Sequence, residues 1–322
     1  MRTIAVADVG GTHARFALAE IEEGRVLTLD EPVTLKTAEH ASFQLAWQEF
    51  GKRKQIDLPN ELALAFAGPV GGDLLKLTNN PWVIRPSLIK ERLDVDRYVV
   101  VNDFGAVAYA VATLPDDQFR HICGPDRPLP SEGVISIVGP GTGLGVAALL
   151  RKPDHYDVIE TEGGHVDFAP LDGLEDRILT ELRRNFRRVS VERIASGRGL
   201  WNLYEALGAI DGRDLKFHDD KQLWAAALEG SDGLALAALD RLCLTLGAVA
   251  GDMALAQGAA GVVIAGGVGL RIADYLPQSG FRDRFIAKGR FERRMDDMPV
   301  RLITHPQPGL FGAAAAFARD YR

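Results

Sequence analysis

Cysteine is scarce in this sequence, and basic residues are fewer than acidic ones. The two cysteines, Cys123 and Cys243, lie far apart and show no metal-ligand spacing. This favours a reduced, cytosolic protein over a disulfide framework or a zinc module. Lysine and arginine total 37 against 44 aspartates and glutamates, a formal net charge of -7. That balance does not indicate a nucleic-acid partner, so an anionic nucleotide would have to be bound locally.

A long uncharged apolar run is also missing. The most apolar long segment, residues 234–257, contains Asp240, Arg241 and Asp252, which leaves no run near the ~18 residues that a membrane-spanning helix needs. The segment is therefore predicted to be a core helix, and no membrane partner is expected. A secretory signal is not expected either, because Met1 leads almost directly into a short strand-like run.

Two familiar nucleotide-binding motifs are absent as well. Residues 139–145, Gly-Pro-Gly-Thr-Gly-Leu-Gly, have glycine at every second position, whereas the dinucleotide fingerprint is Gly-x-Gly-x-x-Gly with a helix after it. No glycine-rich segment ends in the Gly-Lys-Ser/Thr of a P-loop. A nucleotide, if bound, must be held by a different kind of loop.

The composition is that of a soluble globular protein with a substantial core. Of the 322 residues, 47% are hydrophobic and 25% are charged. This length predicts two domains of ordinary size.

Two glycine hairpins carry the most specific signal. Residues 3–9 and 13–19 are predicted to be strands joined at a tip formed by Gly10, Gly11 and Thr12. Backbone N–H groups at such a tip can approach phosphate oxygens closely, and Asp8 just before it is a hard oxygen ligand of the kind that holds magnesium. The alternative is an ordinary glycine hairpin.

The second hairpin repeats this pattern. Residues 134–138 and 146–150 are predicted to be strands on either side of a tip formed by Gly141, Thr142 and Gly143. Together, the two hairpins predict a clamp on a polyphosphate. A further predicted strand, 261–265, ends in Gly266 and Gly267, which would seat a nucleoside because small residues leave room against the sheet.

Asn102 and Asp103 follow a buried strand and precede a helical segment. Open α/β sheets bind ligands at this end of their strands, and a carboxylate there suits a general base that takes a proton from a bound hydroxyl. The alternative is that Asp103 merely caps the next helix.

Other segments are more ambiguous. Asn79 is left open as a site residue, whereas Asn80 is interpreted as turn chemistry. Glu162 and His165 flank two glycines, and they form either a surface turn or a contact with a polyhydroxy ligand; two ligands alone make a poor metal site. Residues 120–133 are predicted to be a loop or domain seam, and the helix after the strand at 261–265 is expected beyond residue 269.

Several motifs together resemble a known superfamily. The superfamily is that of the actin-like ATPases, which include sugar kinases. The motifs that resemble it are Asp8-Val-Gly-Gly-Thr-His-Ala-Arg15, Asn102-Asp103, the 139–145 loop, Ala265-Gly-Gly267 and Pro308-Gly-Leu-Phe-Gly312. Within it the chain resembles the bacterial ATP-dependent glucokinase family, through Leu77-Thr-Asn-Asn-Pro-Trp82, Glu162-Gly-Gly-His-Val-Asp-Phe-Ala-Pro170 and Val191-Glu-Arg-Ile-Ala-Ser-Gly-Arg-Gly199.

The resemblance implies a two-lobed α/β protein of the actin-like ATPase (ribonuclease H-like) fold, with mixed sheets flanked by helices and a cleft between the lobes. Residues 1–109 with 304–322 are expected to form the small domain, and 110–303 the large one. ATP and magnesium are the implied cofactors, glucose the substrate, and a cytoplasmic homodimer the working form. The family pattern makes Asp103 the base and implies that the sugar is contacted by Asn102, Asp103, Glu162, His165 and Glu192.

Three alternatives stay open at this stage. The first is a kinase for another hexose, such as fructose, mannose or N-acetylmannosamine. The second is a filament-forming or chaperone-like ATPase without a small substrate. In such a protein the turn that carries Glu162 and His165 would have no ligand to contact. The third is a catalytically silent sugar sensor, against which the intact Asp103 speaks.

Overall fold

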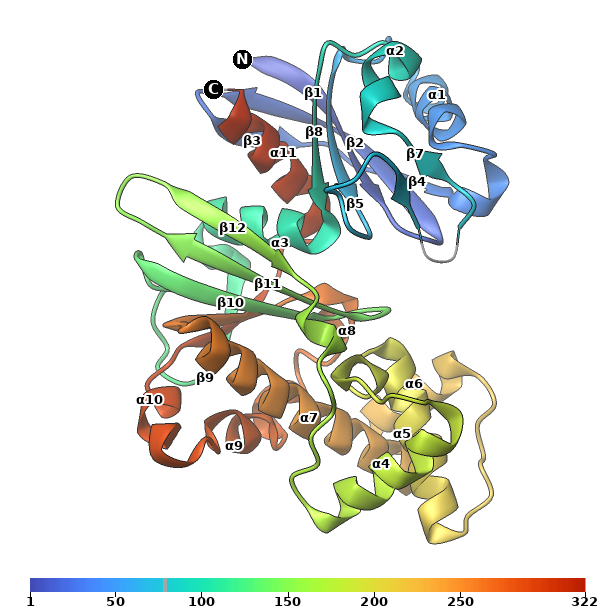
Figure 1. Ribbon diagram of the computed structural model, residues 1–322, viewed down its shortest axis with the longest axis vertical. Coiled ribbons are helices and arrows are strands. Elements are labelled where there is room, and N and C mark those ends of the chain that lie inside the picture. The colour runs from blue at the N-terminus through green and yellow to red at the C-terminus, as the bar shows by residue number, and fades with distance from the viewer. Residues whose placement is uncertain (78–79, 322) are drawn as a thin grey trace. The chain divides into compact units, whose positions relative to one another are not determined.

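The computed structural model describes residues 1–77 and 80–321, and the chain divides into two units (Figure 1). Unit 1 comprises Met1–Pro115 with His305–Arg322, and unit 2 comprises Asp116–Thr304. The sequence-based boundaries at 109/110 and 303/304 differ slightly from this division. The first of them would cut a helix (Asp103–Thr113) that stays whole in unit 1.

Unit 1 is built on a sheet in which β1, β5 and β8 run parallel, in the order β3-β2-β1-β5-β8, with β4 paired to β2. β6 and β7 form a separate two-stranded ribbon. The strands of the unit are β1 (Arg2–Val9), β2 (His13–Glu22), β3 (Arg25–Leu29), β4 (Val33–Lys36), β5 (Glu61–Phe66), β6 (Leu75–Lys76), β7 (Val83–Ile84) and β8 (Arg97–Asn102).

Helices cover both faces of this sheet, as Figure 1 shows for α11 on one side and α1 and α2 on the other. They are α1 (Phe43–Lys54), α2 (Ile89–Leu93), α3 (Asp103–Thr113) and α11 (Pro308–Asp320), with the 3₁₀ turns η1 (Thr37–Glu39) and η2 (Pro86–Leu88). Alternate residues of β1 serve the two faces: Ile4 packs toward α11 and α3, and Ala5 toward α1. Both faces are buried, so the strand reads as a continuous apolar run.

The spacing of apolar residues in α1 follows from its packing. Phe43, Ala46, Trp47 and Phe50 are buried at helical spacing, which confirms the helix expected there. Ser42 caps the helix by accepting a hydrogen bond from the N–H of Leu45 at 3.3 Å.

Unit 2 contains a sheet ordered β12-β11-β10-β13-β14-β9, in which β10, β13 and β14 run parallel. Its strands are β9 (Phe119–Cys123), β10 (Gly133–Pro140), β11 (Leu144–Arg151), β12 (Tyr156–Thr161), β13 (Gly261–Ile264) and β14 (Val300–Ile303). β10 and β11 pair antiparallel, and β13 lies on the other side of β10. This is the glycine hairpin expected from the sequence.

The helices of unit 2 surround a large apolar core. They are α4 (Gly173–Asn185), α5 (Gly197–Asp211), α6 (Asp220–Glu229), α7 (Gly233–Gln257), α8 (Gly266–Arg271), α9 (Phe281–Ile286) and α10 (Glu292–Asp296), with the 3₁₀ turns η3 (Asp116–Gln118), η4 (Gly163–His165), η5 (Val191–Arg193), η6 (Leu276–Gln278) and η7 (Gly289–Phe291). Within the described residues, α7 alone is long and apolar enough to cross a membrane. Of its most apolar window 61% is buried inside the protein, as expected of a core helix.

A buried ion-pair network joins three of these helices. Glu175 of α4 is 3% exposed and pairs with Arg241 of α7 at 3.4 Å and Arg284 of α9 at 3.3 Å. Both arginines also lie 2.6 Å from Asp172, the N-cap of α4. Partial burial pushes the pKa of Asp172 up, but the Glu175 N–H and the arginines outweigh it and hold that pKa below its usual value.

Two sequence-based expectations in unit 2 are wrong. The 120–133 segment is not wholly a loop, because Phe119–Cys123 forms β9 and pairs antiparallel with β14. The helix after β13 begins at Gly266 rather than beyond residue 269.

Both cysteines are buried, and burial raises the pKa of each thiol to about 12, so both stay protonated.

Candidate active site

Three parallel strands of unit 1 end at one edge of its sheet. Val9 of β1 is paired with Phe66 of β5, which is paired with Asn102 of β8. Asp8, Asn102 and Asp103 therefore lie at the carboxyl end of the sheet, where open α/β sheets bind their ligands. The sequence predicted this placement for Asn102 and Asp103, and the strand pairing confirms it; Asp8 was predicted only as part of a glycine hairpin.

Asn102, rather than Asp103, caps α3. The Asn102 Oδ1 accepts hydrogen bonds from the N–H groups of Phe104 at 2.8 Å and Gly105 at 3.1 Å, and its Nδ2 donates to the Gly68 carbonyl at 3.2 Å. Asp103 is the first helical residue and is half-buried. Its Oδ1 accepts a bond from the Phe104 N–H at 2.9 Å.

Asp8 is held between an arginine and the start of a helix. Its Oδ2 lies 3.2 Å from Arg15 Nη1, and the side chain is 22% exposed. A Cβ added at Gly309, in the first turn of α11, would come within 3.2 Å of the same oxygen. Burial raises the pKa of Asp8, and Arg15 opposes that rise.

The Gly10–Thr12 turn is fastened to its surroundings by its own carbonyls. The Gly11 carbonyl accepts bonds from Thr37 Oγ1 at 2.8 Å and from Asn80 Nδ2 at 3.1 Å. Asn80 Oδ1 accepts a bond from the Trp82 N–H at 2.8 Å, which confirms its turn role. Asn80 thus also holds the glycine turn, a contact that the sequence did not reveal. Asn79 lies outside the described residues.

The second glycine turn, in unit 2, is a junction of three segments. The Gly141 N–H donates to the Gly143 carbonyl at 2.8 Å, closing the tip. The Gly197 N–H, at the start of α5, donates to the Gly141 carbonyl at 2.7 Å. Gly266 has φ +78°, and a Cβ there would lie 2.4 Å from the Pro140 carbonyl oxygen. Only glycine permits that approach.

The Glu162–His165 turn rests against the same hairpin. A Cβ at Gly164 would lie 1.9 Å from the Leu144 carbonyl oxygen, so the turn packs directly on the start of β11. Glu162 and His165 are exposed on either side, with Oε2 and Nε2 3.9 Å apart. The Glu192 Oε2 accepts a bond from the Leu144 N–H at 3.0 Å. Three predicted site residues from two segments thus meet at one end of this hairpin.

A cavity of about 670 Å³ opens beside the tip of the hairpin. Its lining includes Thr142 and Gly197, the acidic Asp220, and Arg198, Lys221, Trp224 and Arg271. The Arg271 guanidinium carbon stands 4.9 Å from the centre of the Trp224 ring. None of Arg198, Lys221, Trp224 and Arg271 was predicted as a site residue, because each is an ordinary polar or aromatic position on a helix.

The comparisons with known proteins agree with one another. The family model described as Glucokinase matches residues 5–320. The glucokinase of Zymomonas mobilis is 65% identical over 318 residues, 99% of this chain and 98% of that protein. The structure is similar to a glucokinase from an Antarctic psychrotroph, with TM-score 0.84, 35% identity and 98% of each chain covered. A Streptomyces griseus ROK-family glucokinase, in complex with glucose and AMPPNP, has TM-score 0.66 at 20% identity, with 99% and 100% covered.

The family model, the Zymomonas mobilis relative and the fold together define an ATP-dependent hexose kinase of the actin-like ATPase fold. Motifs and coverage then settle the particular family: the chain belongs to the glucokinase family. The sequence-based resemblance and the predicted fold class are thereby confirmed, and relatives of this kind argue against the non-kinase ATPase alternative.

Proposed function

We propose that this chain transfers the γ-phosphoryl group of ATP to the 6-hydroxyl of glucose, giving glucose 6-phosphate and ADP, the first step of glucose catabolism. The observation that carries the proposal is Asp103, a half-buried carboxylate in the first helical turn at the carboxyl end of the parallel strands. Glucose and an ATP analogue were bound together in the Streptomyces griseus relative, which supports the same pair of substrates here.

Asp103 is the proposed general base. As the glucose 6-hydroxyl attacks the γ-phosphoryl group in line, the carboxylate accepts the hydroxyl proton. The bond from the Phe104 N–H fixes one carboxylate oxygen at 2.9 Å. Most of the acceleration comes from positioning and charge neutralisation, because phosphoryl transfer needs little covalent help from the protein.

The two glycine turns are the proposed phosphate-binding elements. Gly10, Gly11 and Thr12 act from unit 1, and Gly141, Thr142 and Gly143 from unit 2. Support comes from the contacts that fix each turn, through Asn80 in unit 1 and the start of α5 in unit 2. Gly266 and Gly267 are proposed to face the nucleoside. The cavity beside Thr142 is lined by three cations, Arg198, Lys221 and Arg271, against one carboxylate, Asp220, so it offers net positive charge to an anionic nucleotide.

Asp8 is the proposed magnesium ligand. Its donor is a carboxylate oxygen, which suits this hard cation, and one or two carboxylates with substrate phosphates are its usual partners in kinases. Within residues 1–77 and 80–321 no three His, Cys, Asp or Glu side chains gather into a metal-binding group, so the single carboxylate fits a metal brought with the nucleotide. When bound, magnesium neutralises charge on the phosphates.

Glu162, His165 and Glu192 are proposed to bind the ring hydroxyls, with Asn102 and Asn79. A site that hydrogen-bonds hydroxyls rejects sugars that lack or invert them more strongly than an apolar pocket does. Support comes from the meeting of the Glu162–His165 turn and Glu192 at Leu144.

The working form is proposed to be a cytoplasmic homodimer without nucleic-acid or membrane partners. The low cysteine content and the acidic charge support this setting. The dimer is an expectation carried by the family resemblance alone.

The test is ADP production by the purified protein with and without glucose and magnesium, followed by a panel of hexoses. ADP release that needs both glucose and magnesium is expected. Release that is independent of sugar contradicts the proposal in favour of an ATPase. Higher kcat/KM with fructose, mannose or N-acetylmannosamine than with glucose would assign a different hexose.

A further inference from the structure

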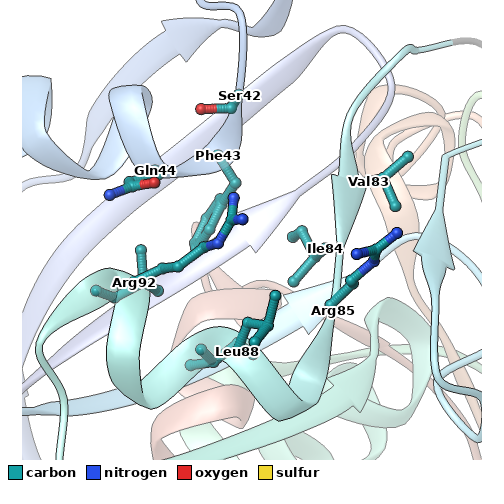
Figure 2. A pocket seen from close by; sticks show the side chains of 10 residues that line it. Ser42, Phe43, Gln44, Val83, Ile84, Arg85, Leu88 and Arg92 are labelled. Atoms are coloured by element: carbon teal, nitrogen blue, oxygen red, sulfur yellow. The ribbon is translucent and has the colours of Figure 1, made fainter.

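A second cavity lies in unit 1, away from every residue assigned to the reaction. It has a volume of about 280 Å³ and lies between the start of α1 and the segment from β7 through η2 to α2 (Figure 2). None of Asp8, Asn102 or Asp103 lines it. Its occupant therefore has to be inferred from its own walls.

The floor of the cavity is apolar. Phe43 from α1, Ile84 from β7 and Leu93 from α2 line it and are buried, and Leu88 of η2 lines it as well. Val83 at its side is 50% exposed, a large apolar side chain that the protein itself leaves uncovered. An apolar ligand body would cover that surface and remove it from water, which favours binding.

The charge at the cavity is of one sign. Arg85 and Arg92 both line it, and Figure 2 shows Arg92 reaching from α2 toward Gln44 and Phe43. Within the described part of the chain neither arginine makes an ion pair, and no acidic side chain lines the cavity. Guanidinium groups are weakly hydrated and bind carboxylates through paired N–H donors. Figure 2 shows Arg92 and Arg85 on either side of Ile84, so Arg92, which reaches over Phe43, is the one placed to pair with a carboxylate, and Arg85 adds positive charge at the other side of the cavity.

The volume limits the size of that anion. At about 30 Å³ for each water-sized group, the cavity holds roughly nine such groups. A protein segment needs a far larger contact area, about 800 Å² on each partner. The occupant that fits is a small molecule.

We propose that this cavity binds a monocarboxylate whose apolar chain or ring has about eight carbons, with its carboxylate at Arg92 and its apolar body over Ile84 and Leu88. This is a binding site additional to those for the sugar and the nucleotide, and it does not depend on the proposed function.

The test is isothermal titration calorimetry of the full-length protein with octanoate, in the presence of saturating glucose and AMPPNP so that the substrate sites are filled. Three matched ligands separate the contributions: acetate has the charge without the chain, octanol the chain without the charge, and octylammonium the opposite charge. The variants are Arg92→Gln, the double variant Arg85→Gln with Arg92→Gln, and Lys90→Gln. Lys90 is a cation on α2 that does not line the cavity.

One octanoate is expected to bind per chain, with acetate, octanol and octylammonium each at least tenfold weaker. Arg92→Gln should raise the Kd about tenfold, as the loss of a charged hydrogen bond does, and the double variant should raise it further. Lys90→Gln should change the Kd less than twofold. The proposal is overturned if the double variant binds octanoate as wild type does, if Lys90→Gln weakens binding equally, or if octanol or octylammonium binds as tightly.

Discussion

Replacing Gly164 with alanine tests how the Glu162–His165 turn is positioned. The added Cβ would lie 1.9 Å from the Leu144 carbonyl oxygen, whereas carbon–oxygen contacts usually lie at about 3.3–3.6 Å. The turn must therefore move by more than about 1 Å from the hairpin. Both side chains proposed to bind the sugar lie on that turn, so both move with it.

A displacement of that size has a calculable cost. A shift of about 1 Å in a positioning element can lower the rate about 100-fold, and overpacking of a tight contact destabilises by about 1–3 kcal/mol. We therefore expect kcat/KM for glucose to fall about 100-fold in Gly164→Ala. The melting temperature should fall by several degrees.

The assay is coupled ADP release at varied glucose and saturating ATP, with a thermal melt of each variant. Gly173→Ala is the matched control, because Gly173 opens α4 and no atom lies within 4 Å of a Cβ there. The control should match wild type in both measurements. A Gly164→Ala enzyme within twofold of wild-type activity and with an unchanged melting temperature would refute the reasoning.

Three further predictions concern other contacts. Glu192→Gln keeps an oxygen for the Leu144 N–H but removes the charge, so KM for glucose should rise about tenfold while KM for ATP stays within twofold. Equal rises in both KM values in steady-state kinetics would instead mean that Glu192 only supports the hairpin. Gly312→Ala places a Cβ 1.7 Å from the Ala106 carbonyl oxygen and forces α11 from α3, so thermal melting should show a drop of about 5 °C, and an unchanged value would contradict the packing. The pKa of Asp172 is lowered in the folded protein, so the stability that its carboxylate contributes is present above the unfolded-state pKa of about 3.9 and is lost as pH falls through the folded-state pKa. The difference in melting temperature between wild type and Asp172→Asn should therefore narrow below about pH 4. A difference that stays constant with pH would contradict this assignment.

Much of the scaffold could be predicted because its strands are buried on both faces. β1, β5 and β10 are short apolar runs bounded by glycine or polar residues, and burial alone selects that pattern. β9 could not be predicted, because Arg120 and His121 interrupt the apolar residues of Phe119–Cys123 and the segment becomes a strand only by pairing with β14. That pairing joins segments about 180 residues apart, and local propensity does not encode it.

The candidate site could be predicted only as separate motifs. Asp103 was recognisable because it follows a buried strand, at the end where open α/β sheets bind ligands, and Asp8 because it precedes the tip of a glycine hairpin. The bond between Glu192 and the Leu144 N–H was not, since it joins residues 48 apart. The cations beside Thr142, such as Lys221, lie on helices whose exposed faces carry many charges. Their approach to the glycine turn depends on how the helices of unit 2 pack.

The account depends most directly on Asp103 as the base. Asp103→Asn retains an oxygen that can accept the Phe104 N–H but cannot take a proton from the sugar. The decisive measurement is kcat for glucose-dependent ADP release in this variant, with glucose affinity measured by calorimetry. We predict that kcat falls by about two to four orders of magnitude while glucose affinity stays within a few-fold of wild type. A kcat within tenfold of wild type would contradict the account.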